Sequence, residues 1–177
     1  DSLQLYKLDA GEIVFNLISR VKGYPLTSVG LNKLHELENI LKSNSEKLDR
    51  FKIDLGRLFN DKGQAVIVQY IKGDEAEMER RRYYNIKNNG YDVYAKMFNV
   101  ALKLTQTDKY LSNSTEVLLH YFSGVALRLK VALTENPKTL IEQALEEQKK
   151  ALALEEYAAY IYNELGILYQ YKNDYTK

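Results

Sequence analysis

Two histidines, His35 and His120, are the only imidazole side chains in this sequence, which also contains no cysteine. A metal site needs several imidazole, thiolate or carboxylate ligands brought together, and nucleophilic catalysis needs a base beside its nucleophile. The two histidines fall on predicted helices that are several elements apart. No Gly-x-Ser-x-Gly elbow, His-Glu-x-x-His pair or phosphate-binding glycine loop occurs. The sequence therefore predicts no catalytic residue, no metal site and no cofactor, and an enzyme is the weakest class of function.

Carboxylates gather at two places, in residues 74–77 and at Glu142, Glu146 and Glu147. A catalytic pair would need an apolar cleft in which the two pKa values are pushed apart. Both clusters instead lie in strongly polar helical segments. The first stands at a helix start, where negative charge suits the helix dipole, and Glu146 precedes Lys150 by one helical turn. We predict that both clusters belong to solvated helix faces.

A run of basic and aromatic residues, from Glu79 to Lys87, has the two ingredients of single-stranded nucleic-acid binding. The flanking glutamates offset its charge, and successive helical residues point in different directions, so the three arginines cannot form one wall. The whole chain carries 25 Lys and Arg against 24 Asp and Glu, which leaves no general field for an anionic partner. Nucleic acid is unlikely as a partner, and binding through residues 80–87 is kept only as a second alternative.

Two prolines interrupt 177 residues, and β-branched residues rarely alternate with polar ones as a half-buried strand requires. We therefore predict an all-α fold, with enough apolar residues, 45%, for a continuous core. No apolar run is long enough for a membrane span, and no pattern identifies the localisation. The helices are expected near residues 2–21, 28–42, 45–60, 64–71, 75–88, 91–104, 115–135, 137–154 and 155–171.

Two stretches read almost alike: Leu55-Gly56-Arg57-Leu58-Phe59 and Leu165-Gly166-Ile167-Leu168-Tyr169. In both, an aromatic follows the glycine by three residues, and a lysine followed by a turn residue comes three residues later. Gly56 is expected to let a neighbouring helix approach, and Gly63 to supply a left-handed turn. Tyr162, Leu165 and Tyr169 are expected to face inward. We also predict a long polar connection from Thr105 to Ser114.

These motifs resemble the tetratricopeptide repeat (TPR) family. The last 35 residues carry the resemblance most fully, residues 46–63 give a second match, and residues 91–104 match a second repeat helix. The resemblance implies antiparallel helix hairpins stacked as a right-handed α-solenoid. Residues 1–44 would form a divergent N-terminal hairpin or cap. Residues 45–177 would hold the repeats, the last of them truncated after its first helix, so that more chain or a partner is expected to cover it.

In such a solenoid the first helix of each repeat lines a concave face that takes a peptide or a partner helix. The positions that would face this groove are Arg50, Arg57, Asn60, Tyr83, Lys87, Tyr121, Arg128, Tyr160, Asn163, Ile167, Gln170 and Tyr171. The resemblance thus implies a protein–protein interaction scaffold whose partner is a protein or a peptide. An intramolecular scaffold, which positions a catalytic or membrane domain of a longer chain, is the first alternative.

Overall fold

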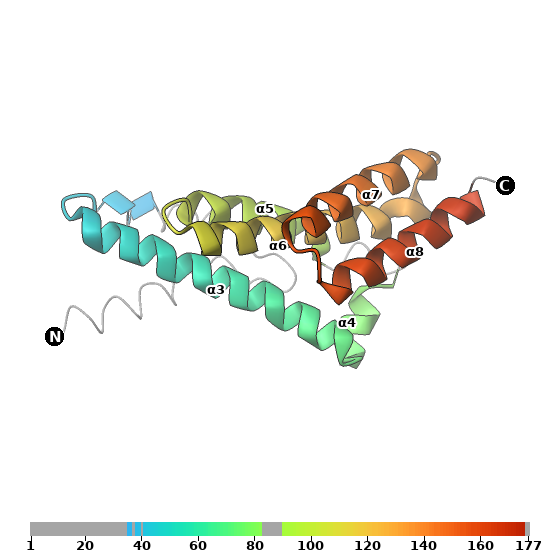
Figure 1. The fold of residues 1–177 in the computed structure, drawn as a ribbon, viewed down its shortest axis with the longest axis horizontal. Helices are drawn as coiled ribbons and strands as arrows, with labels where there is room; N and C mark the ends of the chain where they lie inside the picture. The colour runs from blue at the N-terminus through green and yellow to red at the C-terminus, as the bar shows by residue number, and fades with distance from the viewer. Residues whose placement is uncertain (1–34, 37, 40, 83–89, 176–177) are drawn as a thin grey trace.

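The computed structural model describes residues 35–36, 38–39, 41–82 and 90–175, and all the regular structure within these ranges is helical. From Ser45 to Tyr175 the described residues form six α-helices, which pack together in an elongated array with α3 along one edge (Figure 1). Their bounds are α3 Ser45–Ile71, α4 Glu75–Arg80, α5 Tyr91–Leu104, α6 Lys109–Lys130, α7 Pro137–Leu154 and α8 Ala159–Tyr175, and a short 3-10 helix at Val131–Leu133 follows α6. The all-α prediction is confirmed.

Side-chain caps explain where several of these helices begin. Asn44, Asp108 and Asn136 precede α3, α6 and α7, and each side chain accepts a hydrogen bond from a backbone N–H of the first turn. Pro137 occupies the first turn of α7, where its missing N–H is no loss. At the other end of α3, Gly73 takes a φ of 70°, which suits glycine and ends the helix.

The predicted boundaries hold for α5 and α7 and fail in four places. The expected break at Gly63 is absent, because α3 runs unbroken for 27 residues. Helix α6 begins at Lys109 after a short turn, so the long polar connection from Thr105 to Ser114 is wrong. Helix α8 begins at Ala159 rather than at Glu155. The fifth helix, expected over residues 75–88, ends early, because α4 stops at Arg80 and residues 81 and 82 form a turn and a bend. The predicted helices before residue 35 lie outside the described residues.

Three glycines within the helices allow neighbouring side chains to approach the backbone. A methyl group on Gly56 would lie 2.2 Å from the Cγ2 atom of Thr105, so the close approach here is by a side chain. On Gly63 it would lie 2.6 Å from the ring of Phe98, so this glycine serves packing instead of a turn. Gly124 has the same role, with the amide of Gln148 against it.

One apolar core runs through the array from α3 to α8. Its centre is a group of rings on α5 and α6, in which Phe122 stacks on Tyr94 and Phe98 with ring centroids 4.5 Å and 5.4 Å apart. Tyr91 and Phe98 are buried, with exposed fractions of 1% and 0%. Helices α5, α6, α7 and α8 pack on one another in chain order, and α3 packs on α5 and α6.

Candidate functional site

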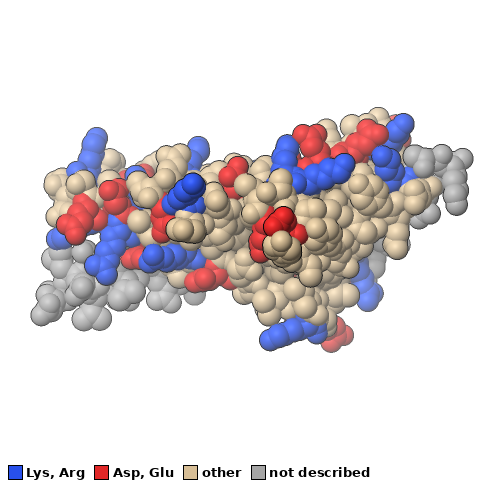
Figure 2. All heavy atoms as spheres, viewed as in Figure 1, with Lys and Arg blue, Asp and Glu red and all other residues tan. Residues whose placement is uncertain are grey.

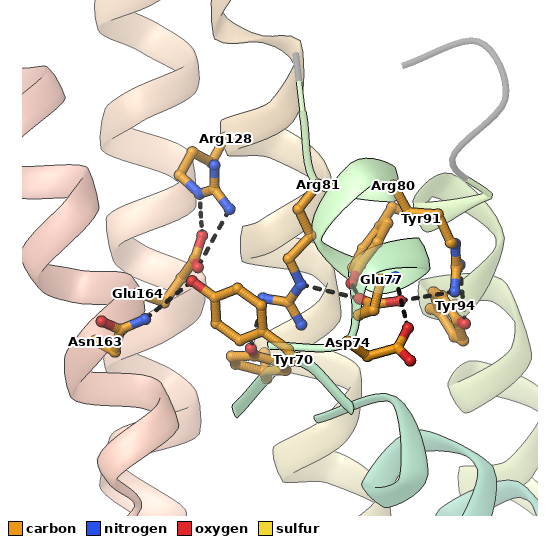
Figure 3. A network of polar contacts seen from close by, with 11 residues as sticks. Tyr70, Asp74, Glu77, Arg80, Arg81, Tyr91, Tyr94, Arg128, Asn163 and Glu164 are labelled. Carbon is orange, nitrogen blue, oxygen red and sulfur yellow. Dashed lines mark hydrogen bonds and ion pairs between the residues drawn. The ribbon is translucent and has the colours of Figure 1, made fainter. Parts of the chain in front are cut away.

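A network of arginine, glutamate and tyrosine side chains joins α3, α4, α5, α6 and α8 (Figure 3). Its centre is Glu77 on α4, whose side chain is 1% exposed. Its carboxylate accepts hydrogen bonds from Arg80 Nη1 at 2.9 Å, from Arg81 Nε at 3.0 Å and from the hydroxyl of Tyr91. The expectation of a solvated acidic helix start is therefore wrong at this residue, because two guanidinium groups and a phenol replace water around it.

Arg81 connects the carboxylate of Glu77 to helices α3 and α6. Its guanidinium stacks on the ring of Tyr70, with the central carbon 3.6 Å from the ring centroid, and its Nη1 donates to the hydroxyl of Tyr121 at 3.1 Å. The buried Nη2 atom has no hydrogen-bond acceptor among the described residues. A planar cation suits this position because it can stack and form in-plane hydrogen bonds at once.

Burial and charge shift the pKa values in this network. Burial alone would lower the pKa of Arg81, but Tyr121, Tyr91 and Glu77 raise it above its ordinary value, so the guanidinium stays charged. Burial raises the pKa of Tyr121 to about 12, even though the Arg81 charge opposes this rise. The pKa of Tyr94 is also raised, first by burial. The phenols therefore remain neutral near neutral pH.

A second ion pair lies beside the first network, between Arg128 on α6 and Glu164 on α8. Both residues are buried, with exposed fractions of 7% and 0%. The guanidinium donates to both carboxylate oxygens, from Nε and, at 3.4 Å, from Nη2. A bidentate pair of this kind fixes the relative orientation of two helices, and breaking it would leave a buried charge without a partner.

Helix α8 also meets the end of α3 and the ring of Tyr121. Asn163 Nδ2 donates to the hydroxyl of Tyr70 at 3.2 Å, near the outside of the network. The ring of Tyr160 meets that of Tyr121 edge to face, with centroids 4.9 Å apart, and its hydroxyl donates to Glu155 at 2.9 Å. The pKa of Tyr160 is raised, first by burial and then by this hydrogen bond to Glu155.

Four of the groove positions predicted from sequence thus come together: Tyr121, Arg128, Tyr160 and Asn163. Tyr121 and Arg128 are buried and bonded to other residues of the chain, so they form the floor of this region and not its surface. On α8, Asn163 and Gln170 are exposed, whereas Ile167, Tyr160 and Tyr171 are half-buried.

The remaining groove positions do not join this region. Arg50 and Arg57 are exposed on the first half of α3, where Arg57 pairs with Asp54 at 3.3 Å. Asn60 is buried, and its amide donates to Thr115 Oγ1 at 3.0 Å. Tyr83 and Lys87 lie outside the described residues.

Sequence reasoning missed Glu77, Arg81 and Glu164 as interior residues. One local signal was present, because Glu77 and Arg81 are four residues apart and fall on one helix face. Their burial depends on Tyr70, Tyr91 and Tyr121, which come from three other helices, and no local pattern shows that these rings converge.

An open pocket of ≈ 500 Å³ lies between α5, α6 and α7. Ala95, Ala126 and Leu127 line its apolar part, and Glu146 and Glu147 line its polar side. Glu147 pairs with His120 at 2.8 Å and with Lys150 at 2.8 Å. Burial would raise the pKa of Glu147, but hydrogen bonds from His120 and Lys150 lower it.

Within the described ranges, no three His, Asp or Glu side chains gather closely enough to hold a metal ion. None of the described helices is both long and apolar enough to cross a membrane, in agreement with the sequence. Comparisons with protein-family models, with curated proteins and with solved structures found no match to this chain.

Proposed function

We propose that this chain is a protein–protein interaction scaffold, built as a TPR-like α-solenoid, whose partner is a peptide or a helix bound along the face shared by α3, α6 and α8. The observation that carries the proposal is the convergence of these three helices. The sequence assigns α6, α8 and residues 45–60 of α3 to first helices of repeats, with the fifth predicted helix as another between α3 and α6. It assigns residues 64–71 of α3 to a second helix. Tyr70 of α3 bonds Asn163 of α8, and the rings of Tyr121 of α6 and Tyr160 of α8 are in contact.

The packing order supports the solenoid. Each of α5, α6 and α7 packs on the next helix in the chain through a short connection, which is the arrangement of stacked hairpins. The buried ion pairs beneath the face also favour rigid presentation. Because Arg81 and Arg128 already hold their neighbours in place, little conformational entropy is lost when a partner docks.

The exposed amides and half-buried rings of α8 are the groups that would touch the partner. Asn163 and Gln170 can offer hydrogen bonds, while Tyr160, Ile167 and Tyr171 offer apolar area at low entropic cost. The nucleic-acid alternative receives less support. Of the three consecutive arginines, Arg81 is buried and Arg80 bonds Glu77, so they do not form a basic surface.

The test is capture from a lysate of the source cells with the 177-residue chain as bait and identification of the bound proteins by mass spectrometry. An Asn163→Ala, Gln170→Ala variant changes two exposed residues of the proposed face. A matched variant, Glu142→Ala with Lys149→Ala, changes two exposed residues of α7 and leaves the net charge unchanged. Helicity of all three chains is checked by circular dichroism.

We expect a discrete partner that the parent and the α7 variant retain and the α8 variant loses. Equal capture by all three would move the binding site away from this face. Capture of no partner by any of them would contradict the intermolecular scaffold and favour the intramolecular alternative.

A further inference from the structure

Five exposed residues of α8 recur at alternating intervals of three and four. They are Ala159, Tyr162, Gly166, Tyr169 and Asn173, and they are called here the α8 seam. This spacing is that of the contact positions in a two-helix coiled coil. The opposite side of the same helix faces the core, where Ile161, Glu164 and Leu168 are fully buried. The seam is thus a second face of α8, separate from the one that holds it to the protein.

The two tyrosines of the seam are exposed. The expectation that Tyr162 and Tyr169 face inward is wrong, since their exposed fractions are 53% and 45%. A methyl group on Gly166 would meet no atom of the described residues within 4 Å, whereas Gly56, Gly63 and Gly124 each receive a neighbouring side chain. Glycine destabilises a helix relative to alanine, and at Gly166 no packing among the described residues offsets this cost.

The middle of α8 is also without exposed charge. From Ala159 to Gln170, every exposed side chain of α8 is uncharged, in a protein of which 28% is charged residues. Figure 2 shows the broad uncharged surface over α8, in contrast with the charged half of the molecule around the start of α3. Interface centres are rich in tyrosine and poor in charge, and two such surfaces meet without repulsion.

The order of side chains along the seam is small, large, small, large. We propose that the α8 seam pairs with the α8 seam of a second copy of this chain, antiparallel and around a two-fold axis near residue 164. Tyr162 then lies opposite Gly166 of the partner subunit, and Ala159 lies opposite Tyr169 of the partner subunit. The symmetry repeats both contacts, so each of the four layers joins a small residue to a tyrosine ring.

The same sequence does not suit a parallel pair. In that arrangement equivalent positions meet, so Tyr162 would oppose Tyr162 of the partner subunit and Gly166 would oppose Gly166 of the partner subunit. Crowded and empty layers would alternate, and both are destabilising. Alternation of size therefore selects the antiparallel orientation and makes the seam complementary to itself.

The proposed interface is small. A fully buried tyrosine contributes about 150–250 Å², and these rings are already about half covered. Four rings then add on the order of 400 Å², well below the total of a standard stable interface. We expect a reversible dimer with a dissociation constant in the micromolar to millimolar range.

Sedimentation equilibrium of the 177-residue chain, at concentrations up to about 1 mM, tests the proposal. The parent chain is expected to shift from monomer to dimer as its concentration rises. Gly166→Glu places a charge in the centre of the seam and should weaken association at least about tenfold. Ala65→Glu puts the same charge on an exposed small residue of α3 and should leave association unchanged.

Gly166→Glu should also keep or raise the melting temperature of the monomer, because glutamate favours helix more than glycine and the site is open. This result separates a lost contact from a failure to fold. A strict monomer at every concentration would overturn the proposal, because the seam would then not pair with a second copy. A helix of another protein would be the remaining partner for the seam. A dimer that Gly166→Glu does not weaken would also overturn it.

Cross-linking tests the orientation, since the chain has no native cysteine. Two single-cysteine chains, Tyr162→Cys and Gly166→Cys, are mixed and mildly oxidised. An antiparallel pair yields mainly the mixed disulfide, because these two positions face each other across the axis. A parallel pair would yield the two symmetric disulfides and would contradict the proposed arrangement.

The dimer does not depend on the proposed partner. Gly166→Glu should still capture the partner of the α3, α6 and α8 face, and the Asn163→Ala, Gln170→Ala variant should still dimerise. The two proposals can therefore fail separately.

Discussion

Replacing Glu77 with glutamine should strongly destabilise the fold. The substitution keeps the size of the side chain but removes the counter-charge of Arg81, whose side chain is 4% exposed. Removing one partner of a buried ion pair leaves a desolvated charge and costs about 3–5 kcal/mol. With a urea m-value of about 2 kcal/mol/M, the unfolding midpoint should fall by roughly 1.5–2.5 M.

The control is Glu79→Gln, on the same short helix. Glu79 pairs with Arg82 at 3.2 Å, but the two side chains are 45% and 60% exposed. An exposed pair contributes about 0–1 kcal/mol, so the same chemical change should have little effect there. Urea unfolding at pH 7, followed by circular dichroism, compares the two variants with the parent at unchanged m.

A double variant separates the buried charge from a simple loss of packing. In Glu77→Gln with Arg81→Met, the guanidinium that lost its partner is itself removed. The loss should therefore be smaller than the sum of the two single losses by at least about 1 kcal/mol. If Glu77→Gln cost no more than Glu79→Gln, or if the single losses simply added, the buried-network reasoning would be wrong.

Three further predictions follow from packing and titration. Gly124→Ala should destabilise the fold by about 1–3 kcal/mol, because the methyl group would lie 2.3 Å from the Nε2 atom of Gln148. Gly166→Ala should instead stabilise the monomer by up to about 1 kcal/mol. Thermal melting of both variants and of the parent compares them. The pKa of Tyr121 is raised to about 12, so its contribution to the stability of the fold is complete below pH 10 and is lost as the pH rises from 10 to 12. Urea titrations of the parent and of Tyr121→Phe should show a shallower alkaline loss of stability in the variant. Equal slopes would contradict this. The pKa of Glu147 is lowered, so its contribution to the stability of the fold is present above pH 4.5 and is lost as the pH falls through its lowered pKa in the folded protein. Glu147→Gln should reduce the free energy of unfolding by less than about 1 kcal/mol at pH 7. The difference from the parent should vanish in acid.

The helical class and two of the helices were predictable because their signals are local. Asn136 and Pro137 mark the start of α7, and Gly90 precedes α5 at a φ of 72°. In both cases the residue that ends or begins the helix acts through its own backbone or through a hydrogen bond within one turn. Such signals can be read without knowledge of the rest of the fold.

The glycines show where local reading fails. Gly63 and Gly73 both follow an apolar helical stretch, but only Gly73 adopts a positive φ and ends α3. Gly63 stays helical because Phe98 and Leu118, far away in the sequence, pack on its bare Cα. A turn glycine and a packing glycine differ in their tertiary neighbours, which the local sequence does not contain.

The candidate site was predictable only in part, for a similar reason. The repeat motif placed Tyr121, Arg128, Tyr160 and Asn163 on related helices, and the structure brings them together. It could not show that Arg128 has a buried partner on α8, because Glu164 has no distinguishing local pattern. Polar residues are buried when several helices supply their partners, and such convergence is a property of the complete fold.

Photo-cross-linking tests the scaffold proposal most directly. A benzophenone side chain replaces Gln170 on the proposed face in one chain and the exposed Lys149 of α7 in a matched chain, each in a lysate of the source cells. The account predicts a discrete adduct with one partner protein from position 170 and none from position 149, with adducts between copies of the chain distinguished by mass. The same partner at both positions, or no partner at position 170, would contradict the claim that this chain binds a partner through the face of α3, α6 and α8.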